Sequence, residues 1–147
     1  MKRIGVLTFH RSYSYGACLQ AYATVQFLEE LGHEVELIDY TNAYEQRPKK
    51  IFYTENGRLS GYLTAAIKNI CFKKKHYWKK AFAHPEKLYP ISQTRYKSHQ
   101  ELESAEYDVL IVGSDQVWNP HITNGMDMAF WLQFGRADKR ISMASMP

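Results

Sequence analysis

The stretch YDVLIVGSDQVWNP, residues 107–120, joins a compact apolar run to a group of polar side chains. Residues 107–112 are typical of a strand buried on both faces, as in a parallel sheet that helices cover. Residues 113–120 then predict a loop with polar side chains, an indole and a proline. Because ligands of open α/β sheets bind outside the carboxyl ends of the strands, this loop is a candidate functional site.

The amino-terminal part of the chain predicts a strand, a helix and a second strand. Residues 3–9 and 34–39 are the predicted strands. Between them, apolar residues recur at helical spacing from Gly16 to Leu31, and Gly32 supplies a helix stop. A parallel crossover of this length is right-handed. The sequence therefore predicts an α/β fold, a Rossmann-like parallel sheet flanked by helices.

The middle of the chain is harder to assign. Residues 41–60 predict a polar loop, residues 59–82 a second helix, and residues 84–98 irregular structure broken by two prolines. A helical turn near residues 100–105 leads into the strand at 107, and residues 140–145 predict a last strand. We expect one domain over residues 1–147, with a variable loop and helical insertion at 41–98. Because the last strand has no helix after it, the domain looks truncated.

Composition limits the class of protein. An apolar content of 45% excludes a disordered chain, and a net charge of +4 concentrated in one stretch argues against nucleic acid as a partner. Cys18 and Cys71 are too few for a disulfide framework or a zinc site. The sequence shows no signal peptide and no apolar segment of the roughly 20 residues that span a bilayer. We expect a cytoplasmic protein, at most peripheral at the inner face of the membrane.

A basic segment within residues 68–80 carries six lysines interleaved with apolar side chains. This pattern suits an anionic membrane surface. More often such a pattern is a solvated helix face whose lysine stems cover apolar neighbours, and that interpretation is favoured over membrane contact.

The turn after the first strand carries groups suited to an anion. Gly16, at the expected helix start, allows close approach to free N–H groups, and Ser14 and Tyr15 add hydroxyls. In the plainer interpretation Ser14 caps the helix and the tyrosine packs. Asp39, at the end of the second strand, stands where a ribose-binding acid is expected, but the turn lacks the G-x-G-x-x-G fingerprint.

His10 and Arg11 follow the first strand and are expected at the same edge of the sheet as Asp115. An arginine there can hold a carboxylate or phosphate through two N–H groups, and a histidine can carry a proton near neutral pH. The alternative for His10 is a solvated loop residue.

In the 113–120 loop, Asp115 is a candidate general base, and Ser114, Gln116 and Asn119 are candidates to hold hydroxyl groups. The alternative for Asp115 is a cap on the following turn. Trp118 is favoured as a structural anchor whose N–H finds a backbone partner, over an indole that stacks on a sugar.

Four segments together resemble the polysaccharide pyruvyl transferase family. They are residues 15–23 (YGACLQAYA), 31–35 (LGHEV), 39–40 (DY) and 113–119 (GSDQVWN). The resemblance covers nearly the whole chain except residues 41–98. It implies one half of a two-domain fold similar to GT-B glycosyltransferases, so we expect residues 1–147 to be the N-terminal domain, with the C-terminal domain absent.

The resemblance also implies an activity, the transfer of pyruvyl from phosphoenolpyruvate to two sugar hydroxyls as a ketal, in cell-surface (exopolysaccharide) polysaccharide biosynthesis. The implied partners are phosphoenolpyruvate and a sugar or glycan acceptor, which can be lipid-linked; no cofactor or metal is implied. The expected catalytic residues are Asp115 and His10, and the expected substrate-binding residues are Arg11, Ser14, Tyr15, Gly16, Ser114, Gln116 and Asn119. Family members have Asn where this chain has Ser14, which alters the polar contacts expected at the helix start.

Two other classes of function stay open. One is a non-catalytic α/β domain that binds a sugar or a nucleotide. The other is a fragment whose exposed face serves only for association with another domain.

Overall fold

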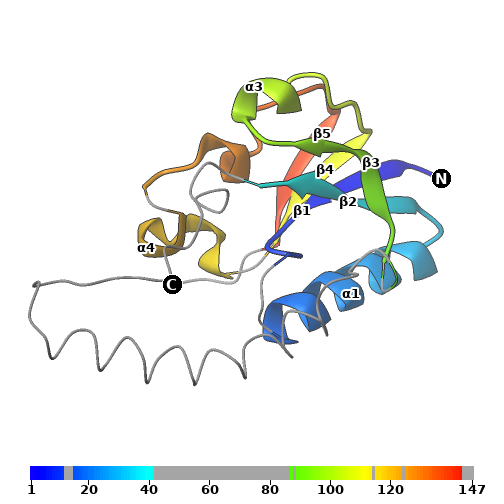
Figure 1. Ribbon diagram of the computed structural model, residues 1–147. Helices are drawn as coiled ribbons and strands as arrows, with labels where there is room; N and C mark the ends of the chain where they lie inside the picture. Colours follow the sequence, from blue (N-terminus) through cyan, green and yellow to red (C-terminus); the bar gives the residue numbers. More distant parts are fainter. Residues whose placement is uncertain (12–14, 42–86, 88, 114, 124, 144–147) are drawn as a thin grey trace, which may run out of the picture.

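The computed structural model describes residues 1–11, 15–41, 87, 89–113, 115–123 and 125–143. A five-stranded sheet forms the centre, with all strands parallel and in the order β3-β2-β1-β4-β5 (Figure 1). The strands are β1 (Arg3–Leu7), β2 (Glu34–Tyr40), β3 (Ile91–Tyr96), β4 (Val109–Val112) and β5 (Lys139–Ser142). The predicted α/β fold with a Rossmann-like parallel sheet is confirmed.

Helical segments lie on both faces of the sheet and at its carboxyl end. The helices among the described residues are α1 (Tyr15–Glu30), α3 (His99–Leu102) and α4 (Pro120–Thr123), and the 3-10 turns are η2 (Asp115–Trp118) and η3 (Met128–Trp131). Helix α1 runs along one face and α3 lies on the other (Figure 1). Segments η2 and α4 follow β4 in the chain, so they lie at the carboxyl edge of the sheet.

The β1–α1–β2 unit forms as the sequence predicts. Strand β1 pairs with β2 in parallel, and α1 buries Cys18, Ala21, Val25 and Leu28, which lie on one side of a 3.6-residue helix. Ala21, Val25 and Leu28 pack on one face of the sheet, where Val6 and Leu37 are fully buried. Gly32, with φ +82°, ends the helix in the left-handed conformation that favours glycine.

The second core lies on the opposite face and is rich in aromatic rings. Phe130 of η3 packs edge-on against Phe9, with ring centroids 5.1 Å apart, and against Tyr40, at 6.0 Å. Leu102 of α3 joins the same buried cluster. The segment after β4 is therefore fixed to the ends of β1 and β2 by ring packing.

Strand β3 corrects the prediction of irregular structure over residues 84–98. Residues 91–96 pair in parallel with β2 at one edge of the sheet, where the strand buries Ser92 and Tyr96. Pro90 does not break the strand because it precedes it, and an edge position needs fewer N–H donors. Its carbonyl accepts a hydrogen bond from Leu37 N at 2.9 Å.

Residues 113–120 also differ from the prediction of a loop, because η2 and α4 give helical turns to most of the described part of this stretch. The predicted last strand is present as β5, and the predicted turn near residue 100 as α3. The helix predicted at 59–82 and the loop over 42–60 lie outside the described residues.

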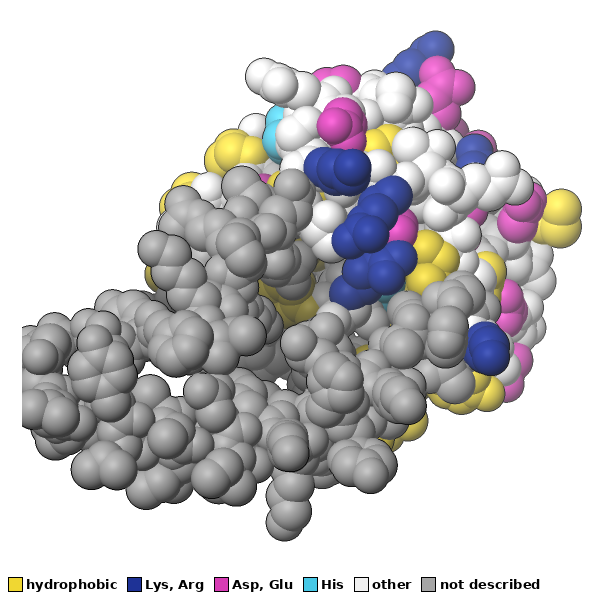
Figure 2. All heavy atoms as spheres, viewed as in Figure 1, with side chains coloured by type: hydrophobic (Ala, Val, Ile, Leu, Met, Phe, Trp, Pro, Cys, Tyr) yellow, Lys and Arg dark blue, Asp and Glu magenta, His cyan; other side chains and the backbone are white. Residues whose placement is uncertain are grey.

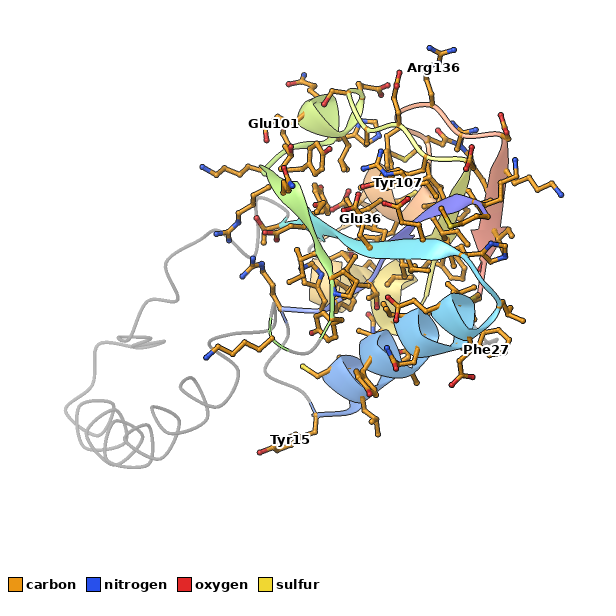
Figure 3. All side chains as sticks on the ribbon, turned by 90° about the vertical axis from the view of Figure 1, so that its right-hand side faces the viewer. Tyr15, Phe27, Glu36, Glu101, Tyr107 and Arg136 are labelled. Carbon is orange, nitrogen blue, oxygen red and sulfur yellow. The ribbon has the colours of Figure 1, made fainter. Side chains whose placement is uncertain are left out.

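A polar network holds the amino edge of the sheet, away from the candidate site. Glu36 accepts hydrogen bonds from Arg3 Nη2 at 2.7 Å and from the Tyr107 hydroxyl at 2.9 Å (Figure 3). The guanidinium of Arg3 also lies over the Tyr107 ring, 4.8 Å from its centroid. Burial and the neighbouring Glu36 carboxylate raise the pKa of the Tyr107 hydroxyl. This cluster joins β1 and β2 to the segment before β4 and has a structural role.

Gly135 allows the segment before β5 to approach the segment before β4. Its φ is +55°, and a methyl group on its Cα would overlap the backbone carbonyl oxygen of Ala105. That carbonyl accepts a hydrogen bond from Arg136 N at 2.9 Å. The Arg140 guanidinium also donates to the Gly135 carbonyl, at 3.1 Å. No side chain fits at position 135 without moving this backbone.

We predict that Gly135→Ala lowers the free energy of unfolding by more than about 3 kcal/mol, because it adds a backbone clash to a left-handed φ. Gly32→Ala is the matched control, since it shares the positive φ but has no atom within 4 Å of the added methyl group. It should cost only about 1 kcal/mol. Urea unfolding measures both, and equal losses would contradict the role given to the Ala105 contact.

Candidate functional site

The central pair of strands brings the two sequence motifs to one edge of the sheet. Strands β1 and β4 are parallel neighbours, with Leu7 opposite Val112, and Gly113 N donates to the Leu7 carbonyl at 3.2 Å. From β1 the chain moves to β2 on one side, whereas β4 lies on the other, so the strand order reverses here. Ligands of open α/β sheets bind at such a position. The expectation of a shared edge is confirmed.

Asp39 and Arg11 form a bidentate ion pair between the ends of β2 and β1. Arg11 Nε donates to Asp39 Oδ1 and Nη2 to Oδ2, both at 2.6 Å. Asp39 is buried and Arg11 is partly exposed. The pair fixes the plane of the guanidinium at the edge of the sheet. Because both carboxylate oxygens accept from Arg11, Asp39 does not have the open arrangement of a ribose-binding acid.

The pKa of Asp39 reflects a balance between burial and its cationic neighbours. Burial acts to raise the pKa of this carboxyl, but hydrogen bonds and charges from His10 and Arg11 outweigh it. The result is a pKa well below the usual range for aspartate. Asp39 is therefore ionised throughout the physiological range, and its charge holds Arg11 in place.

His10 lies beside Asp39 of this pair and is only 1% exposed. Its Nδ1 is 3.1 Å from the Thr8 carbonyl, and its Nε2 is 3.5 Å from Asp39 Oδ1. The His10 carbonyl accepts a hydrogen bond from the Tyr89 hydroxyl at 3.0 Å. The ring therefore contacts Asp39 rather than solvent. The sequence predicted the position of His10 at this edge, but not its burial.

The start of α1 places the predicted anion-binding residues at the surface. Tyr15 is exposed and points away from the domain (Figure 3), and Gly16 is exposed beside it. Ser14 lies outside the described residues, as does Ser114 at the other turn. Sequence reasoning missed Gln20, one turn further along α1. Its Nε2 comes 3.8 Å from the position of a Cβ on Gly113, so an amide faces the end of β4.

The turns after β4 hold the remaining predicted residues. Asp115 begins η2, and its side chain is not among those described. Asn119 Nδ2 donates to Gln116 Oε1 at 2.8 Å, so these two predicted residues lie together. Trp118 Nε1 donates to the Phe130 carbonyl at 3.0 Å, which confirms the predicted backbone partner for its N–H.

Cationic side chains extend from the Asp39 pair along β3. Arg95 is exposed and pairs in register with Asp39, and Lys97 follows one residue after the strand. Figure 2 shows Lys and Arg side chains gathered in a row on this face of the molecule. Sequence reasoning missed Arg95 because the segment was predicted as irregular. A strand assignment for residues 91–96 would have placed it beside Asp39.

Within the described ranges, no three His, Cys, Asp or Glu side chains come together in a way that could hold a metal ion. The helices that the structure describes include none with the length and apolar character needed to cross a membrane.

The fold and the edge site define a doubly wound α/β domain with polar groups at the point where the strand order reverses. The sequence model of the polysaccharide pyruvyl transferase family matches residues 15–144 of this chain. The chain belongs to that family. Comparisons with curated proteins and with solved structures found no match.

We predict that Asp39→Asn lowers the free energy of unfolding at neutral pH by at least about 2 kcal/mol, because it breaks a buried ion pair. In the native chain the stability from Asp39 is present above the ordinary carboxyl pKa of about 4. It is lost as pH falls toward the depressed folded pKa, since the unfolded chain takes up the proton first. Urea unfolding at several pH values should therefore show that the free energy of unfolding falls less between neutral and acidic pH in the variant than in the native chain. Parallel curves for the two proteins would contradict the assignment.

Proposed function

We propose that this chain is the N-terminal domain of a pyruvyltransferase that moves pyruvyl from phosphoenolpyruvate onto two hydroxyls of a sugar. The product is a cyclic ketal, and the setting is cytoplasmic assembly of a cell-surface polysaccharide. The observation that carries the proposal is the family match over residues 15–144, which includes both motifs at one edge of the sheet. In the proposed reaction one hydroxyl proton ends on the enol methylene, which becomes a methyl group. The proton of the other hydroxyl leaves with inorganic phosphate. At the central carbon of the donor, two C–O bonds to the sugar replace the π bond of the enol and the bond to the phosphate oxygen.

The cationic side of the edge suits the donor. Phosphoenolpyruvate carries a carboxylate and a phosphate. Arg11 is bonded to Asp39, and Arg95 stands opposite Asp39 in the register of β2 and β3. Gly16 and Tyr15 at the start of α1 add backbone N–H groups and the positive end of a helix dipole. We propose these four residues, with Ser14, as the binding region for the donor anion.

The turns after β4 suit the acceptor. We propose Asp115 as the base for the attacking hydroxyl, with Ser114, Gln116 and Asn119 holding the hydroxyl pattern. The hydrogen bond between Gln116 and Asn119 supports this because it orients two amides as a unit.

His10 was expected to carry a proton, and that role requires its buried ring to leave the contact with Asp39. The observed geometry better supports a positioning role, in which His10 holds Asp39 and Asp39 holds Arg11. The proton for the methylene then comes from another group, and the C-terminal domain expected from the family is one source for it.

A non-catalytic domain that binds a sugar is the second candidate. The nucleotide version of this alternative is less well supported, because the acid that would hold a ribose is already engaged by Arg11.

We predict that Asp115→Asn lowers the rate of phosphate release from phosphoenolpyruvate by roughly a hundredfold or more, as expected for loss of a general base. The assay uses the full-length protein with a sugar acceptor and compares kcat with the melting temperature, which should change little. Asp138→Asn is the control, since Asp138 is exposed and precedes β5 at the opposite edge. Phosphate release that persists in Asp115→Asn would remove this residue from the mechanism. Saccharide binding without phosphate release under any acceptor would favour the non-catalytic domain.

A further inference from the structure

Two tryptophans lie side by side at the carboxyl edge of the sheet and leave much of their surface exposed. Trp118 is 39% exposed and Trp131 is 50% exposed. Their ring centroids are 5.9 Å apart and their planes are inclined by 38°. By contrast, Phe130, the neighbour of Trp131 in the chain, is only 3% exposed. The domain therefore buries one aromatic ring of this segment and presents the next one to solvent.

The Trp118 indole is held by a hydrogen bond, and the Trp131 indole extends from a turn that is itself fixed. The hydrogen bond from Trp118 Nε1 to the Phe130 carbonyl connects η2 to η3. Asp127 caps η3 by accepting from Ala129 N at 3.0 Å, and it accepts from the Tyr40 hydroxyl at 3.0 Å through Oδ2. Since η3 is fixed at its start and through Phe130, the ring of Trp131 extends from a rigid turn. Aromatic side chains placed in this way bind a ligand with little loss of conformational entropy.

The tryptophans form part of the wall of a pocket of about 240 Å³. Its lining includes Trp118, Pro120, Thr123, Met126, Asp127 and Trp131. The volume is below the roughly 300–1,000 Å³ of sites for drug-sized molecules, so a single ring is the appropriate size of ligand.

The charge of the pocket narrows the ligand class. Among the described residues that line the pocket, Asp127 is the one ionisable side chain, and none is basic. A phosphate or a carboxylate would face a negative group there. A neutral polyhydroxylated ring fits better, because its C–H faces can stack on the indoles. Its hydroxyls can donate to Asp127, which keeps acceptor capacity beyond the bonds from Tyr40 and Ala129.

We infer that this pocket binds one pyranose ring of a saccharide, with Trp131 and Trp118 as the stacking surface and Asp127 as the acceptor for a ring hydroxyl. The pocket begins at η2, directly after β4, and so lies at the same edge as the proposed transfer site. As a subsite for the sugar acceptor, it rests on the proposed function. As a saccharide site, it rests on the geometry of the two rings and the carboxylate.

Intrinsic fluorescence tests the inference directly. The chain has three tryptophans, so Trp78→Phe leaves only the two of the pocket as reporters. Titration of this protein with the methyl glycosides of glucose, galactose, mannose and N-acetylglucosamine should give a saturable change in emission with at least one of them. Trp131→Ala should weaken that binding by roughly tenfold, as expected for loss of a stacking ring. Trp131→Phe should retain part of it, and Asp127→Asn should weaken it while keeping an oxygen to cap η3.

Phe27→Ala is the matched control, because Phe27 is 53% exposed on α1 and points outward there (Figure 3). It should leave the titration unchanged, and circular dichroism should show that each variant is folded. No saturable response to any of the glycosides would overturn the inference. A response to lipid vesicles alone would also overturn it, because the tryptophans would then form an apolar docking surface.

The binding titration needs no phosphoenolpyruvate, so it tests the pocket independently of the proposed transferase activity. Glycoside binding without phosphate release in the full-length protein would support the pocket and count against the transferase. If phosphate is released and the KM for the acceptor is unchanged in Trp131→Ala, the transferase stands and the pocket is not its acceptor subsite.

Discussion

The parallel pairing of β1 with β4 is the constraint on which the rest of the structure depends. Residues 4–7 and 109–112 are far apart in the chain, yet they lie in register at the centre of the sheet. Because both strands run in the same direction, the turns that follow them open at the same edge. Most groups proposed to act on a substrate follow one of these two strands, whereas Arg95 lies on β3 at the same edge. A shift of β4 by one residue would exchange its two faces and remove Leu110 and Val112 from the aromatic core.

At that edge, an ion pair adds to the rigidity that the packing of aromatic rings provides. Asp39 is buried at the end of β2, where an isolated carboxylate would be unstable, and Arg11 and His10 supply the compensating contacts. The three residues therefore join the ends of β1 and β2 while leaving the guanidinium partly exposed. A donor anion would meet a cation whose orientation is already fixed, which reduces the ordering required on binding.

The sequence predicts those parts of the molecule that depend on local patterns. The unbroken apolar run of β4, the helical spacing in α1 and the stop at Gly32 each predicted an element that the structure confirms. Strand β3 was missed because it is polar and follows a proline, and its strand character comes from its pairing with β2. For the site, the sequence predicted the edge of the sheet but not the partners. The contact of Arg11 with Asp39 and the approach of Gln20 to Gly113 depend on how the strands are ordered, and single-sequence patterns do not encode that order.

Strand β5 is the outermost strand of the described sheet, and its residues are exposed along their whole length. The outer side of such a strand offers backbone groups to which another chain can add. Its second residue, Arg140, donates from Nε to the Leu132 carbonyl at 2.9 Å and from Nη2 to the Phe134 carbonyl at 3.3 Å, so this side chain connects the strand to the segment before it. Strand β5 is thus held by backbone pairing with β4 and by one guanidinium rather than by apolar burial.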